Sequence, residues 1–169
     1  MEARQATHGY LSAAEAAACL PARDRVARGP VAVIECVQNI PCNPCEAACP
    51  ARAITVGLPI TALPVLDAAK CVGCGVCIAQ CPGLAIFVVD GSLPGGEGTV
   101  QLPYEAFPPP RVGEKVAALD RAGTRVATAT VEKVLAGKAQ DHTVVVTVRV
   151  PGELIDTVRA ISVERRAEP

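Results

Sequence analysis

The chain has 169 residues and a formal net charge of −1, and half of its residues are hydrophobic although it contains only two Phe, two Tyr and no Trp. Such a length holds one ordinary domain or two small ones, with a core built from Val, Ala, Leu and Ile. The charge is spread evenly and forms no basic patch with interleaved aromatic residues, which excludes nucleic acid as an expected partner. No apolar run approaches the roughly 18 residues needed to span a bilayer, so we expect a soluble, cytoplasmic protein.

Residues 1–30 are predicted to form a short helix and a polar connector. Ser12 and Glu15 have the spacing of a capping box, so a helix should follow and continue to about Leu20. Glu15 also interrupts the apolar stretch that superficially resembles a signal peptide, and we therefore expect no signal peptide. Cys19 lies in this helix, and we interpret it as a small buried hydrophobic residue rather than a metal ligand.

Two cysteine-rich segments follow, each preceded by a short predicted strand, at residues 31–34 and 65–67. Their spacings are Cys36-x5-Cys42-x2-Cys45-x3-Cys49-Pro50 and Cys71-x2-Cys74-x2-Cys77-x3-Cys81-Pro82. The second spacing is typical of a loop that holds a cubane iron–sulfur cluster, in which three thiolates reach three irons and the fourth normally serves another cluster. Gly73 and Gly75 leave room for the backbone to fold closely around the inorganic core.

A structural zinc site is the alternative for these cysteines. Zinc sites usually pair Cys-x2-Cys hooks that a longer loop separates, whereas the second segment is one unbroken run. The grouping of nine cysteines into ligand runs also favours a reducing compartment over a disulfide scaffold. A zinc-stabilised interaction module would be colourless and would contain no acid-labile sulfide.

The two cysteine segments form an internal repeat in which corresponding positions are 32 residues apart, but one ligand position differs. Asn39 stands where Cys71 stands in the second copy, and an amide is a poor substitute for a thiolate on iron. Cys36 lies three residues earlier, and an extended loop containing Pro41 would bring its thiolate to the vacant iron. The alternative is that Cys36 is a core residue and that the first cluster is incomplete or has three irons.

The surroundings of the cysteines are predicted to be poor in positive charge, because only Arg52 and Lys70 are basic between residues 31 and 90. A strand is expected at residues 84–90. The glycine- and proline-rich residues 91–96 should stop it sharply.

Residues 99–169 have a different composition: a stiff triple proline at residues 108–110 is followed by β-prone runs, which are separated by turns. Strands are expected at residues 112–120, 125–135 and 142–150, and residues 153–161 fit either a short helix or a last strand. His142, beside Asp141, is interpreted as a solvated turn residue because no partner nucleophile is in sight. This half contains no cysteine, so we expect it to dock a partner and to carry out no chemistry.

Over about residues 31–90 the cysteine runs resemble the bacterial-type two-cluster ferredoxin family. The resemblance implies an α+β fold, with a ferredoxin-like two-cluster domain at residues 31–98 followed by a small all-β barrel or sandwich domain at residues 99–169. It also implies two 4Fe–4S clusters that each pass one electron. On that model cluster one uses Cys36, Cys42, Cys45 and Cys81, and cluster two uses Cys71, Cys74, Cys77 and Cys49.

The combination of VIECVQNIPCNPCEAACP, LDAAKCVGCGVCIAQCPGLAIF and LPYEAFPPP is further similar to small iron–sulfur subunits of FAD-dependent amino-acid dehydrogenases of the proline or hydroxyproline type. This resemblance implies a hetero-oligomer in which FAD lies on the partner subunit and this chain is a non-catalytic electron-transfer subunit. The even charge agrees, because a diffusing carrier gains speed from electrostatic steering. The alternatives are a free-standing ferredoxin with a β-rich extension and an enzyme with an open iron beside Asn39.

Overall fold

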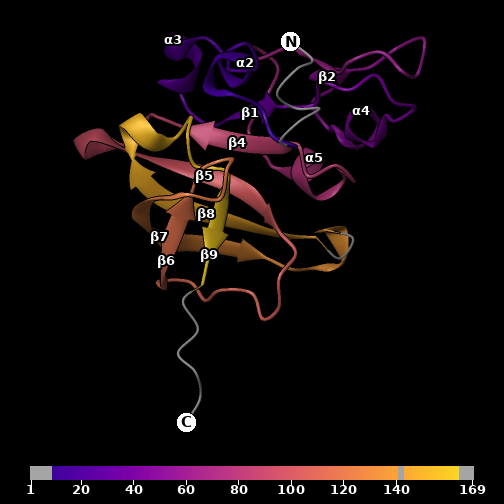
Figure 1. Cartoon of the computed structure of the whole chain (residues 1–169). Helices are drawn as coiled ribbons and strands as arrows, with labels where there is room; N and C mark the ends of the chain where they lie inside the picture. Colours follow the sequence, from indigo (N-terminus) through magenta and orange to yellow (C-terminus); the bar gives the residue numbers. More distant parts are fainter. Residues whose placement is uncertain (1–8, 141–142, 164–169) are drawn as a thin grey trace.

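The computed structural model describes residues 9–140 and 143–163, and its helices and strands gather in different parts of the molecule. Figure 1 shows the short helices and their loops in the upper part and most strands in the lower part. In chain order the elements are α2 (Ala13–Ala17), α3 (Arg23–Val26), β1 (Val31–Ile34), α4 (Pro44–Ala48), β2 (Ile54–Thr55), β3 (Val65–Leu66), α5 (Val76–Ala79), β4 (Ile86–Asp90), η1 (Pro94–Gly96), β5 (Glu97–Tyr104), β6 (Lys115–Leu119), β7 (Arg125–Leu135), η2 (Lys138–Gln140), β8 (Val144–Pro151), η3 (Gly152–Leu154) and β9 (Ala160–Ser162).

Helix α2 begins with the capping box that the sequence predicts. The Ser12 hydroxyl accepts a hydrogen bond from the Glu15 backbone N–H at 3.3 Å, and the Glu15 carboxylate accepts one from the Ser12 N–H at 2.7 Å. The helix ends at Ala17, earlier than the expected end at Leu20. The chain tightens after Ala17, since Cys19 and Leu20 donate to the carbonyls three residues before them.

Seven strands form one antiparallel sheet in the order β1-β4-β5-β8-β7-β6-β9, and β2 and β3 form a separate hairpin. Strand β4 pairs with β1 on one side and with β5 on the other. The predicted boundary between residues 98 and 99 therefore falls inside β5, which lies in the middle of the hydrogen-bonded order. The glycine-rich stop before β5 is the turn of a hairpin, so both parts of the chain contribute to one sheet.

Strand β1 separates two groups of core side chains because successive residues point to opposite faces. Val31 and Val33 pack in a core that also includes Leu102 and Val148, and most of its members come from the strands of the curled sheet. Ala32 and Ile34 belong to a second core, which contains the cysteines of α4 and α5. The cysteine-rich segments therefore pack on one face of β1 and β4, and the larger valine-rich core packs on the other.

The β-prone runs of the second half form strands near their predicted bounds, at Lys115–Leu119, Arg125–Leu135 and Val144–Pro151. The undecided stretch at residues 153–161 contains the end of η3 and the start of β9. Strand β9 pairs with β6 and also packs against β5, so the sheet curls upon itself. Asp141 and His142 lie outside the described residues, and a separate barrel or sandwich stays a prediction. None of the described helices combines the length and apolar character needed to cross a membrane.

Candidate iron–sulfur centres

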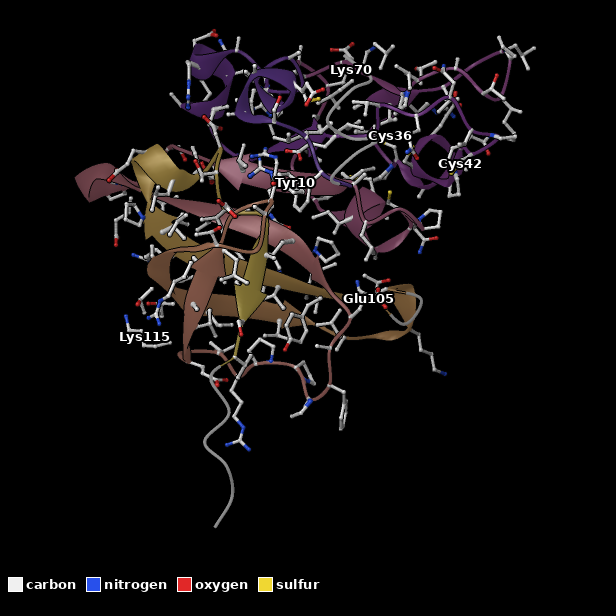
Figure 2. All side chains as sticks on the ribbon, in the orientation of Figure 1. Tyr10, Cys36, Cys42, Lys70, Glu105 and Lys115 are labelled. Atoms are coloured by element: carbon white, nitrogen blue, oxygen red, sulfur yellow. The ribbon has the colours of Figure 1, made fainter. Side chains whose placement is uncertain are left out.

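Eight of the nine cysteines line two separate pockets, four cysteines in each. The pocket that we call the first site is lined by Cys36, Cys42, Cys45 and Cys81. The pocket that we call the second site is lined by Cys49, Cys71, Cys74 and Cys77. Figure 2 labels Cys36 and Cys42, which both lie in the upper part of the molecule. The two groups are the two quartets that the resemblance to ferredoxins implies.

The short helices α4 and α5 each place one cysteine at each site. Helix α4 buries Cys45 at the first site and ends at Cys49, which lines the second site. Helix α5 contains the buried Cys77 of the second site, and Cys81 follows it at the first site. Cys49 and Cys81 come after the last helical residues, Ala48 and Ala79, and each lines the pocket other than the one that the cysteine inside its helix lines. Each repeat copy thus contributes its last cysteine, Cys49 or Cys81, to the other copy's pocket, so each site depends on both halves of the repeat.

Backbone N–H groups point at the sulfur atoms of three of these cysteines. Such hydrogen bonds stabilise thiolates and are one way in which a protein sets the reduction potential of a cluster. The donor–acceptor pairs are Ala32 N to Cys71 Sγ at 3.4 Å, Ala53 N to Cys49 Sγ at 3.2 Å and Ala85 N to Cys81 Sγ at 3.4 Å. Each pocket therefore offers sulfur ligands that are already oriented by the backbone.

The thiols are held close enough to raise one another's pKa. Burial raises the pKa of Cys77 to about 12, and the charges of Cys71, Cys74 and Cys49 add to this shift. Burial also raises the pKa of Cys45, with further contributions from Cys81, Cys36 and Cys42. Without metal these thiols are protonated at neutral pH, so binding of iron releases their protons and stabilises the negative charge that burial disfavours.

The donor set fits a cluster better than a single zinc ion. Within residues 9–140 and 143–163, no three His, Cys, Asp or Glu side chains converge closely enough to hold one metal ion. A tetrahedral zinc ion needs its sulfur atoms within about 2.3 Å of one centre, whereas a cubane takes each thiolate on a different iron at a different corner. Four thiols that line one pocket without converging on a single point fit the second arrangement.

Cys36, and not Asn39, lines the pocket of the first site. Asn39 is exposed, and its side-chain amide donates to the Thr61 carbonyl at 3.0 Å, outside the residues that line the pocket. Cys36 lines the pocket, and burial and the neighbouring thiols of Cys81 and Cys42 raise its pKa. The placement agrees with the interpretation of Cys36 as the replacement ligand.

Cys19, the ninth thiol, lines neither of the two pockets. It is half-buried against the large valine core, and its Sγ lies 3.8 Å from the Glu15 carbonyl oxygen. Burial is the largest cause that raises the pKa of its thiol. Its surroundings are those of a packing residue, as the sequence predicts.

Two side chains that brace the second site were missed by the sequence analysis. Arg25 donates to the Cys71 carbonyl at 2.7 Å, and Gln101 of β5 donates to the Gly73 carbonyl at 3.3 Å. Their distances in sequence from the loop, 46 and 28 residues, left no local signal of either contact. The expectation of an environment poor in positive charge is therefore wrong at the second site, because Arg25 comes from outside the cysteine-rich segments.

Comparison with known families supports iron–sulfur binding by the second cysteine-rich segment. Residues 64–87 match the family model described as a 4Fe-4S binding domain, and they contain Cys71, Cys74, Cys77 and Cys81. A search of curated proteins and a search of solved structures each found no match. Residues 64–87 of this chain therefore form a 4Fe–4S binding domain.

Proposed function

We propose that this protein transfers electrons through two 4Fe–4S clusters, one at the first site and one at the second. The observation that carries this proposal is the division of eight cysteines into two pockets of four. The matched domain supports the iron–sulfur role. The presence of two pockets with four cysteines each supports two clusters instead of one. The cluster supplies the redox chemistry, while the chain binds it, sets its potential and limits its contact with water.

Iron and sulfide analysis of the protein purified without oxygen tests the number of clusters. We expect about eight irons and eight acid-labile sulfides per chain, since each cubane holds four of each. The reduced protein should show the paramagnetic spectrum of two interacting clusters. A content of about four irons, or a three-iron signal in the fresh protein, would contradict the proposal.

Replacing Cys36 by alanine should remove iron from the first site only. The loss of one of four thiolates leaves an iron without its protein ligand, so we expect about half of the iron to be lost. Cys19→Ala is the matched control, because this thiol lines neither pocket, and it should keep its full iron content. Full iron in the Cys36 variant would falsify the ligand assignment.

We further propose that the partner is an FAD-dependent dehydrogenase and that the chain acts as its electron-transfer subunit in the cytoplasm. An exposed apolar side chain beside the first site supports a protein partner, since Leu58 is 95% exposed. Leu58 lies on the loop in which the Ile60 carbonyl accepts a hydrogen bond from the Cys42 backbone N–H. A reduced flavin releases two electrons, and two clusters accept them one at a time. The likeness to subunits of amino-acid dehydrogenases agrees by association only.

Purification of the protein with whatever binds it in its native source tests this partner. We expect a flavoprotein to co-purify, and addition of proline, hydroxyproline or another amine substrate should bleach the flavin and then reduce the clusters. Leu58→Asp should weaken the complex while keeping the iron content, and Val112→Asp, at an exposed position in the turn before β6, is the control. A partner without flavin, or clusters that stay oxidised while the flavin bleaches, would exclude this electron path.

A further inference from the structure

The second site has an arginine beside it, Arg25, that pairs with none of the described carboxylates. The guanidinium of Arg25 donates to four carbonyl oxygens, including that of Cys71 at 2.7 Å. The other three acceptors are the carbonyls of Ala68 at 2.7 Å, Gly29 at 3.0 Å and Pro30 at 3.0 Å. In the described part of the chain Arg25 forms no ion pair, so its full positive charge stays beside the loop that holds Cys71.

The other cations near this loop contribute less because they are exposed or paired. Lys70 lies 2.9 Å from the Asp67 carboxylate, and both side chains are largely exposed. Arg28 is exposed and lies 3.4 Å from the Asp24 carboxylate. Arg52 lies between two residues that line the second pocket, and its side chain is exposed. Water screens all three of these charges, and carboxylates also screen those of Lys70 and Arg28, so the half-buried Arg25 is the cation that acts most strongly on the second site.

The first site has a carboxylate directly after one of its cysteines in the chain. Glu46 follows Cys45 directly, and its carboxylate accepts from the backbone N–H groups of Val56 at 3.1 Å and Gly57 at 3.3 Å. Those residues lead into the loop that contacts Cys42 through the Ile60 carbonyl. No ion pair of Glu46 occurs among the residues that the structure describes, so its negative charge near the first site is also uncompensated.

A second carboxylate near the first site, that of Glu35, is neutralised. Glu35 precedes Cys36 but binds the guanidinium groups of Arg121 and Arg159, and the carboxylate of Asp156 is also close to Arg159. The Asp156 carboxylate is itself paired with the exposed Arg23 at 2.5 Å, so this group leaves no negative charge uncompensated. Glu35 and its two arginines also lie with Phe87 on the valine-core side of the sheet, opposite the cysteines.

We propose that Arg25 and Glu46 make the two clusters unequal, so that the second cluster has the higher reduction potential and holds the electron. This inference rests on the proposed presence of two clusters. Reduction adds one negative charge to a cluster, which a nearby cation stabilises and a nearby anion opposes. In electron transfer between the two clusters, one electron would leave the reduced first cluster and enter the oxidised second cluster, while no bond is made and no proton moves.

A redox titration of the whole protein with dithionite, followed by electron paramagnetic resonance, measures the two potentials. Cys42→Ser and Cys74→Ser assign the signals, since each replaces a cysteine of one site. In the unsubstituted protein the second cluster should be reduced first. Arg25→Gln should lower the second potential selectively and decrease the equilibrium constant for electron transfer to that cluster at least tenfold, which is 59 mV for one electron.

Three further variants separate the charge of Arg25 from its hydrogen bonds. Arg28→Gln removes an exposed positive charge three residues away and should change the second potential less than Arg25→Gln does. Arg25→Lys keeps the positive charge, so the reduction potential of its second cluster should stay close to that of the unsubstituted protein. Glu46→Gln should raise the reduction potential of the first cluster and so decrease the difference between the two potentials. This variant tests the inference even if the Arg25→Gln protein does not retain its second cluster.

The outcomes distinguish this inference from the proposed function. Two clusters with the first reduced before the second, or an Arg25→Gln shift no larger than that of Arg28→Gln, would overturn the inference and leave the two-cluster proposal intact. An iron content of about four would overturn both. Equal shifts of the two reduction potentials in Arg25→Gln would also contradict the inference, because they would show that the charge of Arg25 acts on both clusters alike.

Discussion

Replacing Gly73 by alanine is expected to remove the second cluster and about half of the iron. Gly73 has a φ of +65°, a conformation that costs a residue with a side chain about 1–3 kcal/mol. A Cβ there would lie 2.4 Å from the Pro30 Cβ and 2.7 Å from the Pro30 carbonyl oxygen. Neither atom yields easily, because one belongs to a rigid ring and the other is held by Arg25 at 3.0 Å. The loop must therefore move, and Cys71 and Cys74 move with it.

Two other glycines provide graded controls for this experiment. Gly75 has a φ of +78°, but a Cβ there would meet the Gln101 Oε1 at 2.5 Å, which is the end of a flexible side chain. We therefore expect Gly75→Ala to lose less iron than Gly73→Ala. Gly83 has no atom within 4 Å of an added Cβ, so Gly83→Ala should keep its iron. Iron analysis and the spectrum of the reduced protein measure the series, and full iron in Gly73→Ala contradicts the steric argument.

The grouping of the cysteines was predictable because its signal is local and repeated. Within each segment the ligands lie only a few residues apart, so the spacing restricts how the thiols can surround a cluster. The vacancy at Asn39 was visible from the repeat, and Cys36 was the nearest thiol along the chain. The exchange of Cys49 and Cys81 between sites follows from the family pattern, and the lining of both pockets agrees with it.

The continuity of the sheet was not predictable, because it depends on pairing between distant strands. The glycine- and proline-rich residues 91–96 mark a turn, but a turn of this kind can end a domain or join two paired strands. Register and pairing decide between these, and β4 pairs with β5 across that turn. A protein cut near Gly98 would lose the neighbour of β4 and most of the valine core, so point variants are the cleaner test of docking.

The ionic contacts were not predictable for the same reason. Arg121 and Arg159 are 86 and 124 residues away from Glu35, and neither position carries a local signal of its partner. The sequence shows the residue types, whereas the fold decides which charges meet. Their meeting ties the end of β1, directly before Cys36, to the turn after β6 and to the start of β9.

Glu35→Gln is expected to cause the largest loss of stability among these predictions. The Glu35 side chain is 8% exposed and accepts from Arg121 Nε at 2.8 Å and from Arg159 Nε at 2.7 Å. Arg159 is 3% exposed and also lies over the Phe87 ring, 4.9 Å from its centroid. Loss of the carboxylate leaves two arginines in the core with too little negative charge. Removal of one partner from such a group costs about 3–5 kcal/mol.

The pH dependence of stability provides an independent measurement. Burial raises the pKa of Glu35, but the hydrogen bonds and charges of Arg121 and Arg159 outweigh it and hold the pKa below its usual value. A lowered pKa in the folded state means that the carboxylate stabilises the fold above about pH 4.3, the value in the unfolded chain. That stabilisation is lost as the pH falls through the folded pKa. The Glu35→Gln protein should lack this part of the acid dependence.

Glu132→Gln is the matched control for the loss of stability. Glu132 binds Arg149 at 2.8 Å, which is the same contact distance, but its side chain is 35% exposed and that of Arg149 is 40% exposed. Exposed pairs of this kind contribute about 0–1 kcal/mol. Urea unfolding of both cluster-loaded variants at neutral pH, followed by circular dichroism, should give a much lower midpoint for Glu35→Gln. Equal midpoints would mean that the buried group contributes no more than the surface pair does, and that the fold holds β1 in place by apolar packing alone.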